Sequence, residues 1–126
     1  MKKMSKQKET AVSFLQMAAS GKVREAFEMY TTRRFFHHNA YFKGDAETIM
    51  IAMQENAEQN PNKAFEVKRT IEEGDTVAVH SHVKQNQGDT GAVVVHIFRF
   101  EEGKIVEMWD IGQPIPSDSP NEHGVF

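Results

Sequence analysis

The sequence contains no cysteine. Disulfide bonds, thiolate nucleophiles and cysteine-based zinc sites are therefore excluded. A strong charge of either sign is also absent, because 15 basic and 18 acidic residues leave a formal net charge of −3. No basic run offers the surface that nucleic acids or anionic membranes bind, so we expect no partner that is held through phosphates.

Long hydrophobic runs are missing as well. The first ten residues, MKKMSKQKET, are basic, but no apolar segment follows them and no stretch approaches the length of a membrane span. A cytoplasmic location is the expectation that remains. The chain also has no glycine-rich phosphate loop after a strand and no nucleophile elbow.

Three segments of the first half carry apolar residues every three or four positions, which predicts amphipathic helices. The first runs from Ser5 to a stop at Gly21, and the second from Val23 to Tyr30. The third follows Asp45, a typical N-cap residue, and ends at 60–62, Asn-Pro-Asn. Residues 31–45, TTRRFFHHNAYFKGD, lack a clean period and are rich in aromatics, so we expect an extended, partly buried connection there.

From Ala64 onward the apolar residues alternate with polar ones, as in strands. We expect four strands, at about 64–71, 76–85, 92–100 and 104–111, joined by a turn at 72–75 and a glycine-rich loop at 86–91. With 126 residues and 39% apolar content, the chain is the size of one domain. This order predicts an α+β fold, in which three N-terminal helices cover a curved antiparallel sheet shaped like a cone with an open mouth. We expect one domain over 1–113 and a proline-rich arm over 114–126.

The closing hairpin, VVVHIFRFEEGKIVEMWD at 93–110, carries the most informative polar residues. Gly103 fits the last position of a three-residue loop, Glu101–Gly103, closed by a left-handed glycine. That register places His96 opposite Met108 and Val94 opposite Asp110. A two-residue loop would shift the pairing and put Asp110 on the opposite face from His96.

In the three-residue register, His96 and Asp110 are diagonal neighbours roughly 7–8 Å apart. Apolar neighbours would desolvate Asp110 and make it a usable general acid or base near neutral pH, and His96 would orient it. The alternative is that Asp110 is solvated at a strand end and that His96 merely packs. Phe98 and Met108 share this face and are candidates for the wall of a substrate pocket.

The opposite face of the hairpin is too apolar for a solvent-exposed surface. We expect a homodimer through it, the simplest closed arrangement being isologous, with contacts from Val95, Ile97, Ile105, Trp109 and Ile111.

Three stretches carry a family resemblance: FFHHNAYFKG, the strand VAVHSHV, and HIFRFEEGKIVEMWDIGQP at the end. With the helix–helix–helix–sheet order, the chain resembles the SnoaL-like polyketide cyclases, part of the wider superfamily with the nuclear-transport-factor-2 fold that includes ketosteroid isomerase. The resemblance covers about Lys8 to Gln113, and the final stretch is its most specific part.

This resemblance implies a cone-shaped α+β barrel that is usually dimeric. In the characterised cyclases a pocket aspartate acts as acid and base in an intramolecular aldol closure beside a histidine, without a metal or organic cofactor. Asp110 and His96 occupy the matching positions. Other relatives do no chemistry, so a non-catalytic ligand-binding or assembly module is the alternative.

Four further histidines depart from the apolar pocket that a polyaromatic substrate would need, and they favour a smaller or more polar ligand: His37, His38, His80 and His82. His80 and His82 point the same way on one strand. With His96, His37 or His38 they form a second alternative, a divalent-metal site. They would instead lie on the outer face, or at the dimer interface, if Val77, Val79, Ser81 and Val83 pack under the helices.

The segment after the second helix offers further candidates for substrate binding. Asn39 is positioned to donate a hydrogen bond to a developing enolate oxygen, although a turn cap is the alternative role. Tyr30 and Tyr41 are candidate phenol donors, with packing as their alternative. The leading hypothesis is proton transfer next to a carbonyl of a small molecule, as in aldol cyclisation, isomerisation or hydration. Asp110 would exchange the proton and His96 would tune it, while His37, His38, Asn39 and the phenols would polarise the substrate oxygen.

Overall fold

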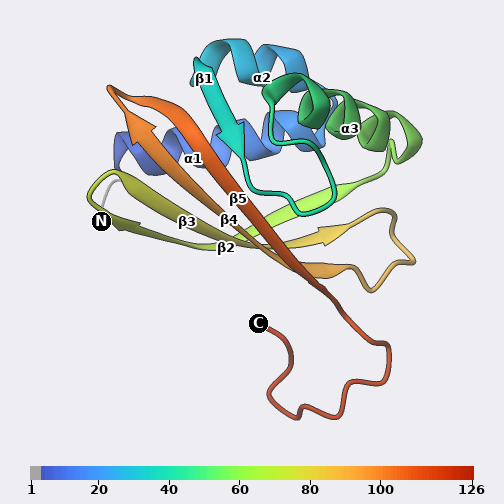
Figure 1. Cartoon of the computed structure of the whole chain (residues 1–126). Coiled ribbons are helices and arrows are strands. Elements are labelled where there is room, and N and C mark those ends of the chain that lie inside the picture. Colours follow the sequence, from blue (N-terminus) through green and yellow to red (C-terminus); the bar gives the residue numbers. More distant parts are fainter. Residues whose placement is uncertain (1–3) are drawn as a thin grey trace.

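The computed structural model describes residues 4–126, which form three helices and a five-stranded sheet (Figure 1). The helices are α1 (Lys6–Ala19), α2 (Val23–Tyr30) and α3 (Ala46–Gln59). The Ser5 and Asp45 side chains accept hydrogen bonds from Lys8 N at 3.1 Å and Thr48 N at 3.3 Å. These N-caps satisfy free amide groups of the first turns of α1 and α3, and they confirm both predicted helix starts.

The strands are β1 (Thr31–His37), β2 (Ala64–Glu73), β3 (Thr76–Lys84), β4 (Ala92–Glu101) and β5 (Lys104–Pro114). Their order in the sheet is β1-β5-β4-β3-β2. Strands β2 to β5 form the predicted antiparallel meander, whereas β1 pairs with β5 in parallel. The expected α+β fold is confirmed, but the sheet is mixed rather than purely antiparallel.

β1 corrects the interpretation of 31–45 as a connection only. Phe35 and His37 are buried while Arg34 and Phe36 are exposed, the alternation expected of a strand at the edge of a sheet. The partner of β1 lies about 70 residues further along the chain, at β5. No local pattern in the sequence reports a pairing over that separation.

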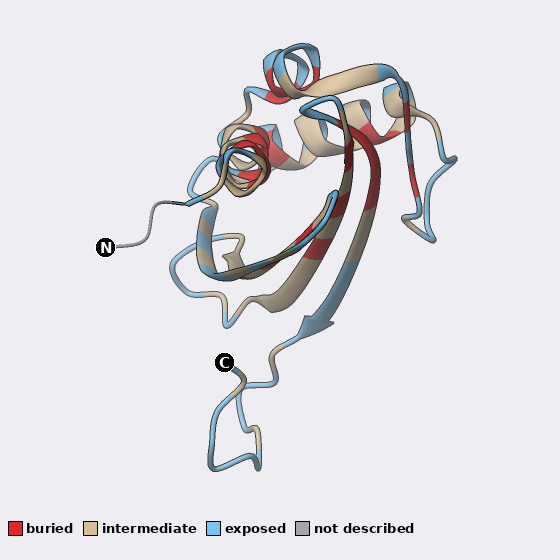
Figure 2. Ribbon diagram, turned by 90° about the vertical axis from the view of Figure 1, so that its left-hand side faces the viewer, coloured by how far each residue is buried: buried red, intermediate tan, exposed pale blue. Residues whose placement is uncertain are grey.

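The helices cover the concave side of the curved sheet (Figures 1 and 2). Phe14 of α1 joins the layers, because its ring makes edge-on contacts with Phe27 of α2 at 5.1 Å and Phe98 of β4 at 5.7 Å. Phe27 in turn contacts Phe35 of β1 at 5.2 Å. This core fills the part of the concave side near the β4–β5 turn and leaves the other part free for a cavity.

The β4–β5 turn differs from the predicted three-residue loop. Glu102 and Gly103 both have positive φ, 50° and 80°, and Glu101 pairs with Lys104. A two-residue turn of this kind matches the twist of the flanking strands. The pairing then jumps from Phe100↔Ile105 to Arg99↔Glu107, so β5 carries one extra residue in a bulge.

This bulge returns the later residues of β5 to the predicted face. His96 therefore lies directly opposite Asp110, and Phe98 opposite Met108, rather than on a diagonal. Ile105 belongs to the buried core, so its expected place on the outer face is wrong. A similar irregularity in β2 between Val67 and Arg69 leaves Ile71 on the outside with 61% of its surface exposed.

The C-terminal residues after β5 return to the outer face of the sheet. Thr90 Oγ1 donates to Ile115 O at 2.7 Å, and the Phe126 ring lies 5.5 Å from the His80 ring and 4.9 Å from the His82 ring. Lys68 Nζ lies 4.9 Å from the centre of the Phe126 ring. Within 4–126, none of the helices combines the length and the apolar character that crossing a membrane requires.

Candidate active site

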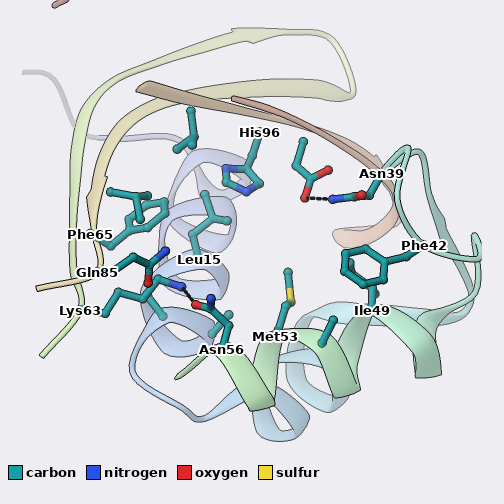
Figure 3. Close-up of a pocket in the computed structure, with 16 residues that line it drawn as sticks. Leu15, Asn39, Phe42, Ile49, Met53, Asn56, Lys63, Phe65, Gln85 and His96 are labelled. Carbon is teal, nitrogen blue, oxygen red and sulfur yellow. Dashed lines mark hydrogen bonds between the residues drawn. The ribbon is translucent and has the colours of Figure 1, made fainter. Parts of the chain in front are cut away.

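A cavity of about 330 Å³ lies between the concave face of the sheet and helices α1 and α3 (Figure 3). Its walls are mainly apolar, with a few polar groups, which is the usual character of a small-molecule site. The apolar side chains come from both helices, from β2, β3 and β4, and from the loop between β1 and α3: Leu15, Ala18, Ala19, Phe42, Ile49, Ala52, Met53, Phe65, Val83 and Val94. The polar ones are Asn39, Asn56, Lys63, Gln85, His96 and Asp110.

Asp110 is held in place by one hydrogen bond. Asn39 Nδ2 donates to its Oδ2 at 3.0 Å, whereas its Oδ1 is buried with no hydrogen-bond partner in 4–126. A buried carboxylate oxygen without a donor is costly unless a ligand supplies one. This oxygen is therefore the acceptor that the fold leaves for a bound molecule.

Asn39 is itself oriented by its neighbours. Its Oδ1 accepts from Tyr41 N at 2.9 Å, which directs its amide nitrogen to Asp110. Its backbone N donates to His37 Nδ1 at 3.1 Å, so the proton of His37 is on Nε2, which donates to Lys43 O at 2.8 Å. Thus His37 does not line the cavity but holds the loop that places Asn39.

His96 faces the cavity from β4, opposite Asp110 (Figure 3). Burial lowers the pKa of His96 to about 4, an effect partly opposed by the negative charge of Asp110 and reinforced by the positive charge of Lys63. The imidazole is therefore neutral near pH 7. Its Nδ1 is buried and has no partner among the described residues, so the neutral ring has a hydrogen-bonding position free for a ligand.

Three further polar side chains, Asn56, Lys63 and Gln85, line the other side of the cavity, and the sequence alone did not identify them as site residues. Lys63 Nζ donates to Asn56 Oδ1 at 2.5 Å, and Gln85 Oε1 is buried without a partner in 4–126. The sequence predicted that Asn56 lies on the third helix, but not that its side chain faces a cavity. Lys63 and Gln85 sit at element boundaries, where nothing in the sequence distinguishes a pocket residue from a solvated one.

His38 and Tyr41 lie outside this cavity. The His38 ring stacks on Trp109 at 4.8 Å, and its Nε2 lies 2.6 Å from Glu107 Oε2 on the outer side of the sheet. Tyr41 is 89% exposed. Both border a shallower groove of about 630 Å³, which shares Asn39, Val94, His96 and Asp110 with the cavity. Asp110 therefore lies where this groove meets the cavity.

The other candidates for substrate binding take structural positions. The Tyr30 hydroxyl lies 2.8 Å from Ser13 Oγ, between α2 and α1. Phe98 and Met108 are fully buried in the core, closer to the β4–β5 turn than the cavity reaches. Phe98 and Met108 therefore belong to the hydrophobic core and do not line the cavity.

His80 and His82 lie on the outer face, because Val77, Val79 and Ser81 fill the inner face of β3. His82 Nε2 lies 2.9 Å from Thr90 O, and both rings contact Phe126. This is the outer-face alternative stated above, so neither histidine reaches the cavity. In the described part of the chain, no three histidine, aspartate or glutamate residues gather as metal ligands.

Known proteins share this architecture. The family described as SnoaL-like domain matches residues 11–108. A Bacillus cereus protein provisionally named a polyketide cyclase has a similar structure, with a TM-score of 0.72 and 22% identity over 85% of this chain and 74% of that one. AclR of Streptomyces galilaeus, provisionally named a hydroxylase, has a TM-score of 0.71 and 19% identity, over 88% of this chain and 91% of that one. A SnoaL-like protein of unknown function from Burkholderia thailandensis has a TM-score of 0.71 and 13% identity, over 90% of this chain and 99% of that one.

At these identities the structural likeness shows the fold alone. A search of curated proteins found no significant match.

Proposed function

The chain belongs to the SnoaL-like domain family, and from that premise we propose that it is an enzyme of cofactor-independent acid–base chemistry next to a carbonyl group. Asp110 moves the proton, and the reaction is an aldol cyclisation, an isomerisation or a hydration. The observation that carries the proposal is the pair of buried, unpartnered atoms, Asp110 Oδ1 and His96 Nδ1, on two residues that line the same cavity.

Asn39 supports this role by holding one carboxylate oxygen. Because Asn39 Nδ2 donates a hydrogen bond to Asp110 Oδ2, the other carboxylate oxygen, Oδ1, is the one that accepts a proton from a substrate carbon. Asn39 thus positions the base, in place of the direct contact with an enolate oxygen that the sequence predicted.

His96 supports the proposal as a neutral hydrogen-bond donor. A ring with a pKa of about 4 carries no charge near pH 7, and a neutral imidazole still polarises a carbonyl through its N–H group. A donor pre-organised toward a developing enolate oxygen stabilises the transition state by several kcal/mol. In this role His96 acts on the substrate as well as on Asp110.

The size of the cavity favours a small substrate. About 330 Å³ lies near the lower end of the range for ligand pockets, roughly 300–1,000 Å³. A fused polyaromatic polyketide would fill or exceed this cavity and would have to extend into the adjoining groove of about 630 Å³. The four further histidines, on which the expectation of a smaller or more polar ligand rested, lie outside the cavity and therefore do not support it. The names of the similar proteins include a cyclase and a hydroxylase, so the fold does not select the reaction.

Exchange of carbon-bound protons tests the proposal without knowledge of the natural substrate. The protein is incubated in D₂O with a panel of small ketones and 3-oxo acids, and deuterium uptake next to the carbonyl is followed by NMR. Replacing Asp110→Asn keeps the shape but removes the base, so the catalysed exchange should fall by about 100-fold or more. Asp118→Asn in the exposed tail is the matched control and should leave the rate unchanged.

Two results would contradict an enzymatic role. The first is an exchange rate that Asp110→Asn does not alter. The second is wild-type protein that binds members of the panel but exchanges none of their protons, which would favour the ligand-binding module.

We further propose that the protein is a homodimer through the outer face of β4 and β5. Ile97 pairs with Trp109 across these strands, and both remain partly exposed. Their neighbours Val95 and Ile111 extend the apolar surface, with Ile111 59% exposed. A second copy would cover it.

A further inference from the structure

The cavity has a positively charged side that acid–base chemistry at Asp110 does not use. It is formed by Lys63 before β2, Asn56 on α3 and Gln85 after β3, all lining the cavity. In Figure 3 these three side chains lie together, across the cavity from Asn39. Leu15, Met53 and Phe65 line the same cavity. A molecule that spans it therefore meets a cation on one side, apolar walls, and the Asp110–His96 pair on the other side.

The charge of Lys63 lacks an anionic partner. Among the ion pairs of 4–126 none includes Lys63, whereas Lys68 on β2 pairs with Glu66 at 3.1 Å. The one side-chain hydrogen bond of the Lys63 ammonium goes to Asn56 Oδ1, so two of its three protons remain available. A half-buried ammonium in this condition is stabilised by a bound anion.

The pKa of Lys63 agrees with an anion at this place, and the Gln85 amide agrees with it once its two ends are exchanged. Burial lowers the pKa of Lys63, which is the effect of losing water without gaining a counter-charge. The Gln85 amide has a buried oxygen without a partner in the described chain. Since either end of an amide fits the same space, reversing it would present Nε2 as a second donor.

We infer that Lys63, with Asn56 and Gln85, binds a carboxylate group of the substrate. The substrate class is then a small oxo acid, in which an apolar chain or ring separates the carboxylate from the reacting carbonyl. This assignment rests on the proposed function for the position of the carbonyl, whereas the carboxylate site itself does not depend on turnover. The Lys63 ammonium holds the substrate, and Asp110 and His96 act on its other end.

A pair of probes that differ only in charge tests the inference. trans-Cinnamate and the neutral trans-cinnamamide have nearly the same shape, and binding of each is measured by NMR titration of the isotope-labelled protein. Wild-type protein should bind cinnamate about tenfold more tightly or better, a difference of about 1.4 kcal/mol. Lys63→Met should remove the preference, and Lys63→Arg should keep part of it. Lys68→Met removes a lysine charge from β2, outside the cavity, and should leave the preference unchanged.

The inference is overturned by a wild-type preference below about threefold, including the case in which cinnamate does not bind at all. It is also overturned by a preference that survives in Lys63→Met. If that variant does not fold, Lys63→Gln gives the same decision with a side chain that keeps a polar end. Because the titration needs no reaction, a failed carboxylate site leaves the proton-exchange result standing. Loss of exchange in turn leaves the probe preference measurable.

Discussion

At the scale of single residues, the pKa of His96 has the largest shift among the titratable groups described in 4–126. The Phe65 and Phe98 ring centres each lie 6.1 Å from the imidazole centre, and Nδ1 has no hydrogen-bond partner within 4–126. Burial therefore opposes protonation more strongly than the nearby carboxylate favours it, and the pKa falls to about 4. The same balance that keeps the ring neutral for catalysis makes the fold sensitive to acid.

We expect the free energy of unfolding to fall as the pH falls between about 6.5 and 4. In this window the unfolded chain binds a proton on His96 and the folded chain does not, so protonation favours unfolding. Over the whole window the loss is about 3 kcal/mol. His96→Gln should remove this part of the pH dependence in urea denaturation, and His123→Gln in the exposed tail should not. Equal pH dependence in the wild type and His96→Gln would refute the assignment.

Asn39 shows what reasoning from single residues can and cannot reach. Its candidacy came from a residue type suited to hydrogen bonding, and the structure does place it in the cavity. Its partner Asp110 lies 71 positions away, and its orientation depends on Tyr41 N and on the tautomer of His37. Such contacts are set by the pairing of β1 with β5, so the residue was predictable and its role was not.

At the scale of elements, the bulge in β5 decides the geometry of the site. Gly103 correctly indicated a left-handed residue at the turn, but Glu102 adopts the same region and makes the turn one residue shorter. Without the extra residue at 106, the shorter turn would have sent Asp110 to the outer face. A turn and a bulge with opposite effects on register leave the alternation of apolar residues almost unchanged, so the pattern alone could not separate them.

Gly91, directly before β4, is a position in this sheet where the structure predicts that only glycine fits. It has a φ of +84°, and a Cβ there would collide with Val83 O, the backbone of β3. We expect Gly91→Ala to lower the free energy of unfolding by more than the about 1–3 kcal/mol of a left-handed alanine alone. Thermal and urea denaturation measure the loss.

Gly74 provides the matched control for that substitution. Its φ is +59°, but no atom lies within 4 Å of the position that an added Cβ would take, so Gly74→Ala carries the backbone strain without the collision. Equal losses for the two variants would show that β3 and β4 adjust to the added methyl group.

At the scale of the whole molecule, one sheet face forms the core and the cavity. On the other face Phe126 contacts His80 and His82 of β3, and the part formed by β4 and β5 is the surface of the proposed homodimer. Arg99 on this outer face binds Glu107 at 2.7 Å and Glu101 at 2.8 Å, so its charges are paired beside the apolar residues. A surface of this kind suits contact with an identical copy, in which the same groups meet across a two-fold axis.

We expect Ile97→Glu to weaken the proposed dimer by about tenfold or more in its dissociation constant. An unpaired carboxylate at the centre of an apolar contact loses its water on association. Sedimentation velocity across a range of concentrations measures the change. Ile51→Glu, an exposed isoleucine on α3, adds the same charge on the helical side and should not alter the dimer. Wild-type protein that stays monomeric at high concentration would rule the interface out.

Local patterns in the sequence determined the helices and the antiparallel meander, because periodicity and caps act over a few residues. They also predicted one face for His96 and Asp110, but through a three-residue turn that the structure replaces with a shorter turn and a bulge. Tertiary structure alone decided the parallel pairing of β1, the direct opposition of His96 and Asp110, the Asn39 contact and the place of Lys63 in the cavity. Each of these depends on chain segments that are distant in sequence and meet only when the sheet curves around its core. The residue types of a site are thus readable from the chain, whereas the partners that set their charge and orientation come from the fold.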